Sequence, residues 1–166
     1  MNIGEVCSRD LVCAPAETSI ENVARLMREE HVGIVVITKS PADEPIAAGV
    51  VTDRDIAFAL INRSGDVRRV RADQVMNRDP LVLCEDDAVE SAIDRMRRRG
   101  VRRAPVVTAR GSLIGLISTD DLVAHLAGEL TGLARLLEEQ PGIERLRRGG
   151  APRARPAGFM EAGHGI

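Results

Sequence analysis

Two short polar segments carry residue types that can bind a nucleotide. Thr52 and Asp55 lie three residues apart, and Ser118 and Asp121 repeat this spacing. Each pair follows an apolar stretch and begins a predicted helix, so the hydroxyl and the carboxylate project from one helix N-terminus. A carboxylate can accept hydrogen bonds from two ribose hydroxyls. A hydroxyl, with the free backbone N–H groups of a helix start, can donate to phosphate. The pairs therefore predict two turns that bind ribose and phosphate.

A second interpretation of these pairs remains open. Ser, Thr and Asp are common at helix N-termini, where their oxygens accept hydrogen bonds from the first backbone N–H groups. Thr52, Asp55, Ser118 and Asp121 would then only cap their helices.

Other chemistries have less support. The three histidines and three cysteines are dispersed, without the close pairs typical of zinc sites, so we expect no metal and reduced thiols. The phosphate-binding glycine-rich loops and the Gly-x-Ser-x-Gly elbow of hydrolases are missing. We therefore expect a chain that is not an enzyme and needs no catalytic cofactor.

The sequence contains itself twice. Residues 6–10 align with residues 75–79 at an offset of 69, and residues 49–55 align with residues 115–121 at an offset of 66. The first copy therefore carries three extra residues, which we place in a loop near residues 40–45. Such self-similarity indicates a repeat architecture.

Each copy predicts the same order of elements. Apolar runs at residues 11–14, 34–37 and 48–51 predict strands, with counterparts at 81–84, 104–107 and 113–117. Apolar residues at helical spacing from Ile20 and from Val89 predict an amphipathic helix in each copy. Thr18 and Asp87 are candidate N-caps for these helices, each three residues before a glutamate. A second helix follows Thr52 and Ser118, so the order is β-α-β-β-α, twice. Units this small should share a core.

These motifs resemble a tandem pair of cystathionine β-synthase (CBS) domains, or Bateman module. The resemblance rests on Gly-Val-Val-Thr52-Asp-Arg-Asp55, Gly-Leu-Ile-Ser118-Thr-Asp-Asp121 and Val101-Arg-Arg-Ala-Pro105. It implies an α/β fold with two β-α-β-β-α repeats related by pseudo-twofold symmetry. We place the repeats at residues 3–61 and 72–126, with a linker at 62–71, a helical extension at 127–140 and a flexible basic tail at 141–166.

The resemblance also implies an adenosine-containing ligand. In the family, adenine lies between strands and is bound by backbone groups, which here belong to Ile34-Val35-Val36 or Arg103-Ala104-Pro105. Apolar walls would come from Val12, Val32, Leu81 and Val101. AMP, ADP, ATP, NAD-type cofactors and S-adenosylmethionine share the adenosine that these residues would contact, so the number of phosphates stays open.

The two predicted sites differ in charge. Arg54 corresponds to Asp120, whereas Arg102 and Arg103 correspond to Gly33 and Ile34. We hypothesise that Arg54 binds phosphate at the first site and that Arg102 and Arg103 bring positive charge to the second. Alternatively, all three are solvated surface arginines.

Composition limits the possible partners. The net charge of -2 and the pI near 6.0 give no field that would attract nucleic acid or an anionic membrane. The chain lacks Trp and Tyr, which argues against stacking of single-stranded bases. No apolar run approaches the roughly 20 residues that span a bilayer. We expect a cytoplasmic regulatory module that forms a homodimer and binds neither nucleic acid nor membrane. Two alternatives remain: a structural module with degenerate nucleotide sites, and a protein that binds nucleic acid through its basic tail.

An apolar stripe continues beyond the second repeat. It consists of Leu126, Leu130, Leu133 and Leu137, at helical spacing. We expect such a stripe to be covered within the chain, or otherwise to form a dimer surface.

Overall fold

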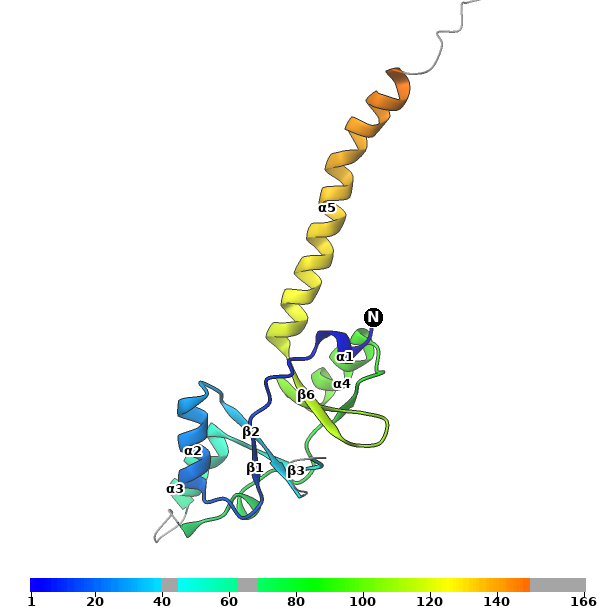
Figure 1. Cartoon of the computed structure of the whole chain (residues 1–166). Coiled ribbons are helices and arrows are strands. Elements are labelled where there is room, and N and C mark those ends of the chain that lie inside the picture. The colour runs from blue at the N-terminus through cyan, green and yellow to red at the C-terminus, as the bar shows by residue number, and fades with distance from the viewer. Residues whose placement is uncertain (40–44, 63–68, 150–166) are drawn as a thin grey trace, which may run out of the picture. The chain divides into compact units, whose positions relative to one another are not determined.

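The predicted order of elements is confirmed in the computed structural model, which describes residues 1–39, 45–62 and 69–149 (Figure 1). The first half comprises α1 (Ile3–Val6), β1 (Cys13–Pro15), α2 (Ile20–Glu29), β2 (Ile34–Thr38), β3 (Ala47–Thr52) and α3 (Asp53–Asn62). The second half comprises the 3-10 helix η2 (Ala72–Gln74), β4 (Leu83–Cys84), α4 (Val89–Arg99), β5 (Arg103–Val107), β6 (Leu113–Ser118) and α5 (Thr119–Gly149). Thus β-α-β-β-α occurs twice, each time after one short helix.

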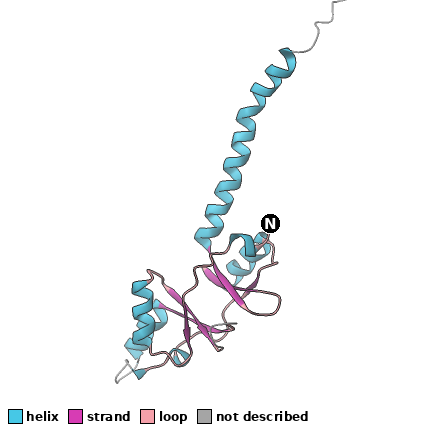
Figure 2. Cartoon of the chain, in the orientation of Figure 1, coloured by secondary structure: helices cyan, strands magenta, loops and turns pink. Residues whose placement is uncertain are grey.

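The strands form two three-stranded sheets of identical topology (Figure 2). In the first, β2 pairs parallel with β1 and antiparallel with β3; β5 does the same with β4 and β6. Both antiparallel pairs contain a register shift, between Ile37 and Thr38 and between Val106 and Val107. These positions are 69 residues apart, which is the offset of the sequence repeat, so the two copies share even this irregularity.

The amphipathic helices α2 and α4 bury equivalent faces. In each helix the N-cap lies one residue after the predicted one. Ser19 is the N-cap of α2, and its hydroxyl accepts a hydrogen bond from the N–H of Asn22 at 3.3 Å. The N-cap of α4 is Ala88, which makes no side-chain cap bond. The prediction that Thr18 and Asp87 are the caps is therefore wrong. Asp87 instead accepts from the N–H of Cys84 at 2.8 Å and pairs with Arg95 at 2.6 Å.

The short helices α1 and η2 are exchanged between the repeats. α1 contacts β4 and β6, and Figure 1 shows it beside α4 of the second repeat. Its fully buried Ile3 belongs to the core of the second repeat. Correspondingly, Ala72 of η2 is buried in the core of the first repeat. Backbone hydrogen bonds hold both exchanged helices in place. The Ile3 N–H donates to the backbone carbonyl of Asp87 at 2.9 Å, and the Ala72 N–H donates to the backbone carbonyl of Thr18 at 2.8 Å. The core of each repeat is therefore completed by the segment that begins the other.

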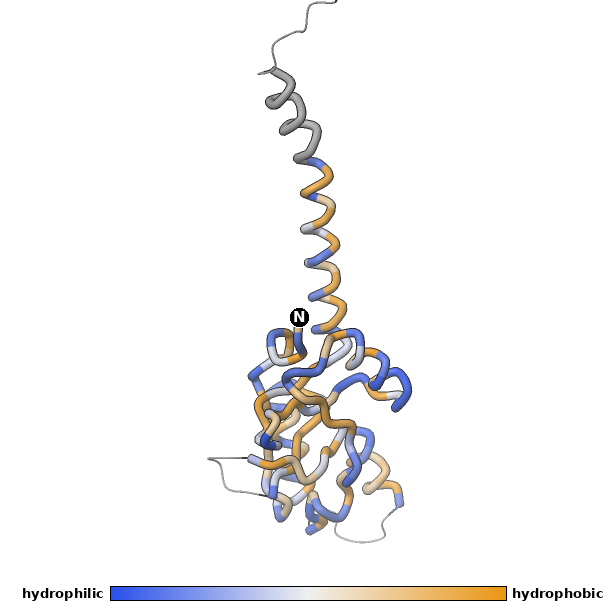
Figure 3. The backbone as a smooth tube through the Cα atoms, turned by 90° about the vertical axis from the view of Figure 1, so that its right-hand side faces the viewer, coloured by the Kyte–Doolittle hydropathy of each residue, from blue (hydrophilic) through white to orange (hydrophobic). Residues whose placement is uncertain are grey.

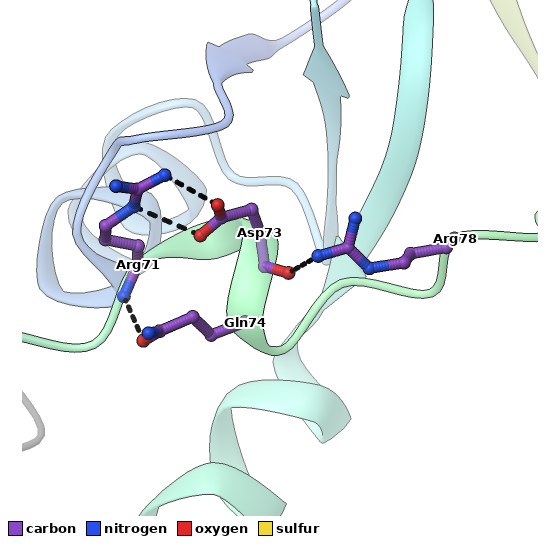
Figure 4. A network of polar contacts seen from close by, with 4 residues as sticks. All are labelled: Arg71, Asp73, Gln74 and Arg78. Carbon is purple, nitrogen blue, oxygen red and sulfur yellow. Dashed lines mark hydrogen bonds and ion pairs between the residues drawn. The ribbon is translucent and has the colours of Figure 1, made fainter.

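A small polar network fixes these exchanged segments. Arg71 pairs with the carboxylate of Asp73 at 2.6 Å, its N–H donates to the side chain of Gln74 at 3.2 Å, and Arg78 donates to the Asp73 carbonyl (Figure 4). Sixty-nine residues earlier, Arg9 donates to the carbonyl of Gly4 at 3.1 Å, in the position of Arg78. The same arginine-to-carbonyl bond thus holds both segments.

The shared core that the sequence predicts is confirmed. One apolar cluster combines Ile34, Val36 and Val50 of the first sheet with Leu113 of the second. Two backbone bridges join the repeats at equivalent places, Val50 with Asn77 and Ser8 with Leu116. Neither sheet is therefore complete without the other repeat.

The chain divides into two compact units, residues 1–126 and 127–166. Helix α5 passes Pro141 and ends at Gly149, so the irregular tail predicted from residue 141 does not begin there; residues 150–166 lie outside the described residues. Along the described part of α5, apolar residues recur through the helix (Figure 3), and the stripe leucines are exposed. The expectation of cover within the chain stays a prediction, because the two units are described separately. Among the described residues, no helix has the length and apolarity needed to cross a membrane.

Candidate ligand-binding site

The two predicted turns have nearly identical hydrogen bonds. Oδ2 of Asp55 accepts from the N–H of Thr52 at 2.8 Å and from its hydroxyl at 2.7 Å, while the N–H of Asp55 donates to Oγ1 of Thr52 at 3.3 Å. In the second turn, the bonds between Ser118 and Asp121 measure 2.8, 2.6 and 3.1 Å. This reciprocal pattern is a capping box. The capping interpretation is therefore realised in both turns.

The capping bonds limit what the α3 start can offer a ligand. The N–H of Asp53 donates to the Gly33 carbonyl at 3.3 Å, and the N–H of Arg54 donates to Oδ1 of Asp53 at 2.7 Å. These two N–H groups are therefore not free in the structure, and phosphate binding at this helix start stays a prediction. What remains at the turn is Oδ1 of Asp55, which makes no hydrogen bond within the described residues and can accept from a ligand hydroxyl.

A cavity of about 520 Å³ lies at the first turn. This volume is within the roughly 300–1,000 Å³ of small-molecule sites. The first repeat contributes Gly33, Ile34, Val50, Thr52, Asp53, Arg54 and Asp55. The rest of the lining consists of Asn77, Gly100, Val101, Arg102 and Arg103. The cavity is therefore built by both halves of the repeat structure, with apolar and charged walls.

Three arginines meet in this cavity. Arg54, Arg102 and Arg103 are exposed, and within the described part of the chain their guanidinium groups make no hydrogen bond or ion pair. Asp53 and Asp55 also line the cavity, so the lining has an excess of one positive charge (three arginines minus two aspartates). Guanidinium groups without a protein partner are well suited to bind phosphate.

The structure groups these arginines differently from our sequence hypothesis, which assigned Arg54 to one site and Arg102 and Arg103 to the other. Arg102 does reach the second turn, since its carbonyl accepts from the N–H of Thr119 at 2.9 Å. It nevertheless lines the cavity of the first turn together with Arg103. Arg102 precedes β5, and Arg103 is its first residue. Their counterparts Gly33 and Ile34 line the same cavity.

Gly33 keeps part of this wall open. A Cβ at this position would lie 3.5 Å from Oδ2 of Asp53 and 3.6 Å from a terminal guanidinium nitrogen of Arg103. A larger side chain would therefore occupy the space between an acidic and a basic group that both face the cavity.

Several predicted site residues do not line the cavity. Val35 and Ala104 are fully buried in the two repeat cores, Leu81 is buried in the second core, and Pro105 is also fully buried. Val12 and Val32 pack against the first core. Ser118 and Asp121 stand at the second turn, outside the lining. Conversely, the sequence analysis did not predict that Gly33, Val50, Asp53, Asn77 and Gly100 line the cavity. For Asn77 and Gly100 the only signal in the sequence is the repeat alignment, which pairs them with Ser8 and His31.

The cysteines have no role in this site. Burial raises the pKa of the Cys7 thiol against the opposing effect of Arg9, and burial also raises the pKa of Cys13. Both thiols are free, and a raised pKa makes them poor nucleophiles. Within the described residues, no three His, Cys, Asp or Glu side chains gather closely enough to hold a metal ion.

Comparison with known proteins identifies the family. The CBS domain family model matches residues 3–62 and 70–128. The chain belongs to the CBS domain family and carries two copies of the domain. It is similar to the uncharacterized protein MK0525 of Methanopyrus kandleri, with 35% identity over 124 residues that cover 74% of this chain. The match covers 61% of the length of that relative.

Solved structures confirm the fold. The CBS domain protein PAE2072 from Pyrobaculum aerophilum, complexed with AMP, matches with a TM-score of 0.65 and 28% identity, over 77% of this chain and 99% of that protein. The CBS domain pair of protein MJ0100, in complex with 5-methylthioadenosine and S-adenosyl-L-methionine, matches with a TM-score of 0.66 and 19% identity, over 78% and 98%. Both of these proteins therefore bind adenosyl compounds.

Proposed function

We propose that this chain is a regulatory module that binds a phosphorylated adenosine ligand in the cavity at the first turn. The observation that carries the proposal is the meeting of the Asp55 carboxylate with three guanidinium groups in one cavity of about 520 Å³. The similarity to the AMP complex of PAE2072 supports it.

Each part of such a ligand has a matching group. Oδ1 of Asp55 would accept hydrogen bonds from the ribose hydroxyls, because Oδ2 is occupied by Thr52. Ile34, Val50 and Val101 provide apolar wall for the base. The guanidinium groups of Arg54, Arg102 and Arg103 would bind the phosphates.

The charge of the cavity also selects among adenosyl ligands. AMP, ADP, ATP and NAD carry phosphate, which three arginines attract. S-adenosylmethionine carries a positive sulfonium group instead, which the same arginines repel. We therefore propose that the chain prefers phosphorylated ligands.

Regulation would follow from the position of the cavity between residues of both repeats. A ligand that binds Asp55 on one side and Arg102 and Arg103 on the other favours arrangements that keep these groups at bonding distance. Such a shift requires different affinities for two arrangements. We propose that the module reports ligand occupancy in this way and does not itself catalyse a reaction.

The test is titration calorimetry with AMP, ADP, ATP, NAD and S-adenosylmethionine on the full chain and on Asp55→Asn. This change retains an oxygen that accepts from Thr52 but replaces the oxygen that faces the ligand with an NH₂ group. We expect at least a tenfold weaker affinity for the phosphorylated ligands. Asp121→Asn is the matched control, since its turn has the same hydrogen bonds outside the cavity.

Three results would contradict the proposal. Equal affinity in wild type and Asp55→Asn would exclude the first turn, and loss of affinity only in Asp121→Asn would move the site to the second turn. Absence of heat and of thermal stabilisation with every ligand would favour the alternative, a structural module with degenerate sites.

A further inference from the structure

A row of exposed apolar residues lies on helix α5. Val123, Leu126, Leu130, Leu133 and Leu137 have exposed fractions of 65, 44, 67, 62 and 66%. We call these five residues the leucine seam. By contrast, Leu122, which adjoins the seam, is only 4% exposed and belongs to the core of the second repeat. One side of the helix start is therefore packed, while the seam is not.

We propose that the leucine seam binds the same seam of a second copy of this chain. The seam residues are separated by three, four, three and four positions. This spacing averages 3.5 residues, and two helices with such a row bury it against each other as a short coiled coil. A row that is complementary to itself fits a two-fold contact between identical chains.

The residues beside the seam are compatible with two copies in contact. Ala127 and Ala134 follow Leu126 and Leu133 directly, and their small side chains let a second helix approach closely. Between residues 123 and 138 the only charged groups are Glu129, Arg135 and Glu138. Identical helices therefore meet without a block of like charge, which would otherwise repel them.

The composition of α5 gives an independent reason for a partner. Gly128 and Gly132 lie in the middle of the helix, and no atom lies within 4 Å of a Cβ added to either. Glycine disfavours a helix, and most helical stability in proteins comes from packing of an apolar face. The seam side chains are exposed, so the packing that stabilises this helix would come from the second copy.

This contact does not depend on the ligand site. It would make the chain a dimer whether the cavity is occupied or empty. Among the described residues, the first repeat shows no counterpart of the seam, since α3 is described only over Asp53–Asn62.

Sedimentation velocity on the full chain over a wide concentration range tests the proposal. We expect reversible self-association, and we expect Leu130→Asp/Leu133→Asp to raise the dissociation constant by at least about tenfold, as loss of central apolar anchors does. Thr131→Asp is the control for a negative charge at this place, since it adds one aspartate directly after Leu130 but off the seam. Unchanged thermal unfolding of the repeats shows that the variants fold.

Hydrogen exchange of residues 123–138 separates this contact from association through any other surface. We expect these amides to become more protected as the wild-type concentration rises, but not in the double variant. Monomeric wild type, or equal association of the double variant and wild type, would overturn the proposal. Protection that does not change with concentration would show that the chain itself covers the seam, which would also overturn it.

Discussion

Gly49 lies so close to Asn77 that a Cβ on the glycine would be 2.5 Å from the asparagine carbonyl oxygen. Gly115 stands in the same relation to Ser8, also at 2.5 Å. At both places the neighbouring residue, Val50 or Leu116, exchanges backbone hydrogen bonds with the crossing segment. Because Gly49 and Gly115 have no side chain, the two exchanged segments can lie directly against the sheets.

Gly49→Ala should destabilise the repeats, because the methyl group must displace backbone and weaken both bonds between Val50 and Asn77. We expect a loss of about 1–3 kcal/mol in the free energy of unfolding, the usual cost of overpacking. Urea denaturation measures it. Gly128→Ala is the control of opposite sign: its Cβ meets no atom within 4 Å, so helix content by circular dichroism should rise. Equal stability of Gly49→Ala and wild type would contradict the close approach.

His31→Gly should stabilise the chain. His31 has φ 55 and Gly100, its counterpart in the repeat, has φ 64. The left-handed conformation is unfavourable for residues with a Cβ, so glycine at residue 31 should add about 0.5–1 kcal/mol to the free energy of unfolding. Gly100→Ala should cost a similar amount. Denaturant unfolding of both variants checks the prediction, which fails if both changes have the same sign.

Ile3→Ala should destabilise the second repeat, although Ile3 belongs to the first in sequence. Its side chain is fully buried among core residues of the second repeat. Truncation of a buried isoleucine costs about 2–5 kcal/mol. Hydrogen exchange should show the loss of protection in β5 and β6. Asp10→Ala, at an exposed position of the same segment, should stay within about 0.5 kcal/mol of wild type.

Stability should decrease at alkaline pH through Cys7 and Cys13. Burial raises the pKa of both thiols in the folded state, so the folded chain holds protons that the unfolded chain releases. This contribution is fully present below the ordinary thiol pKa of about 8.5 and is lost as the pH rises through the folded-state pKa. The pH dependence of urea denaturation should be shallower in Cys7→Ala/Cys13→Ala. An unchanged slope would contradict the assignment.

Arg103→Ala and Arg54→Ala should each weaken binding of a phosphorylated ligand about tenfold or more, since bonds to charged groups contribute about 1.5–3 kcal/mol. The affinity for adenosine, which lacks phosphate, should stay the same. Arg110→Ala is the control, because Arg110 is exposed and does not line the cavity. A parallel loss of adenosine binding would show that the arginines act on the fold and not on the phosphates.

The repeat, the strands and the amphipathic helices could be predicted from the sequence because they depend on local periodicity. The exchange of α1 and η2 could not, since Ile3 and Ala72 look like ordinary apolar residues of their own repeats. The position of Arg102 and Arg103 was missed for a geometric reason. Gly33 and Ile34, their counterparts, line the same cavity, so these positions lie where the repeats meet and alignment alone cannot assign them to one site.

The two turns illustrate a further limit. The pattern of Thr52 and Asp55 was compatible with ligand binding and with helix capping, and the hydrogen bonds show that capping uses only one carboxylate oxygen. Residue types alone cannot distinguish the two oxygens of a carboxylate. The three-dimensional arrangement is needed to separate the structural bond from the group that faces the cavity.

The exchange of α1 and η2 also bears on how such a chain arises by gene duplication. A half-length chain with one repeat would leave open the surface that the exchanged helix covers, and a second copy that lent its first segment would close it. The present chain has the form of such a swapped pair in one polypeptide. A cut between the repeats should therefore leave two fragments that stay associated, each completing the core of the other.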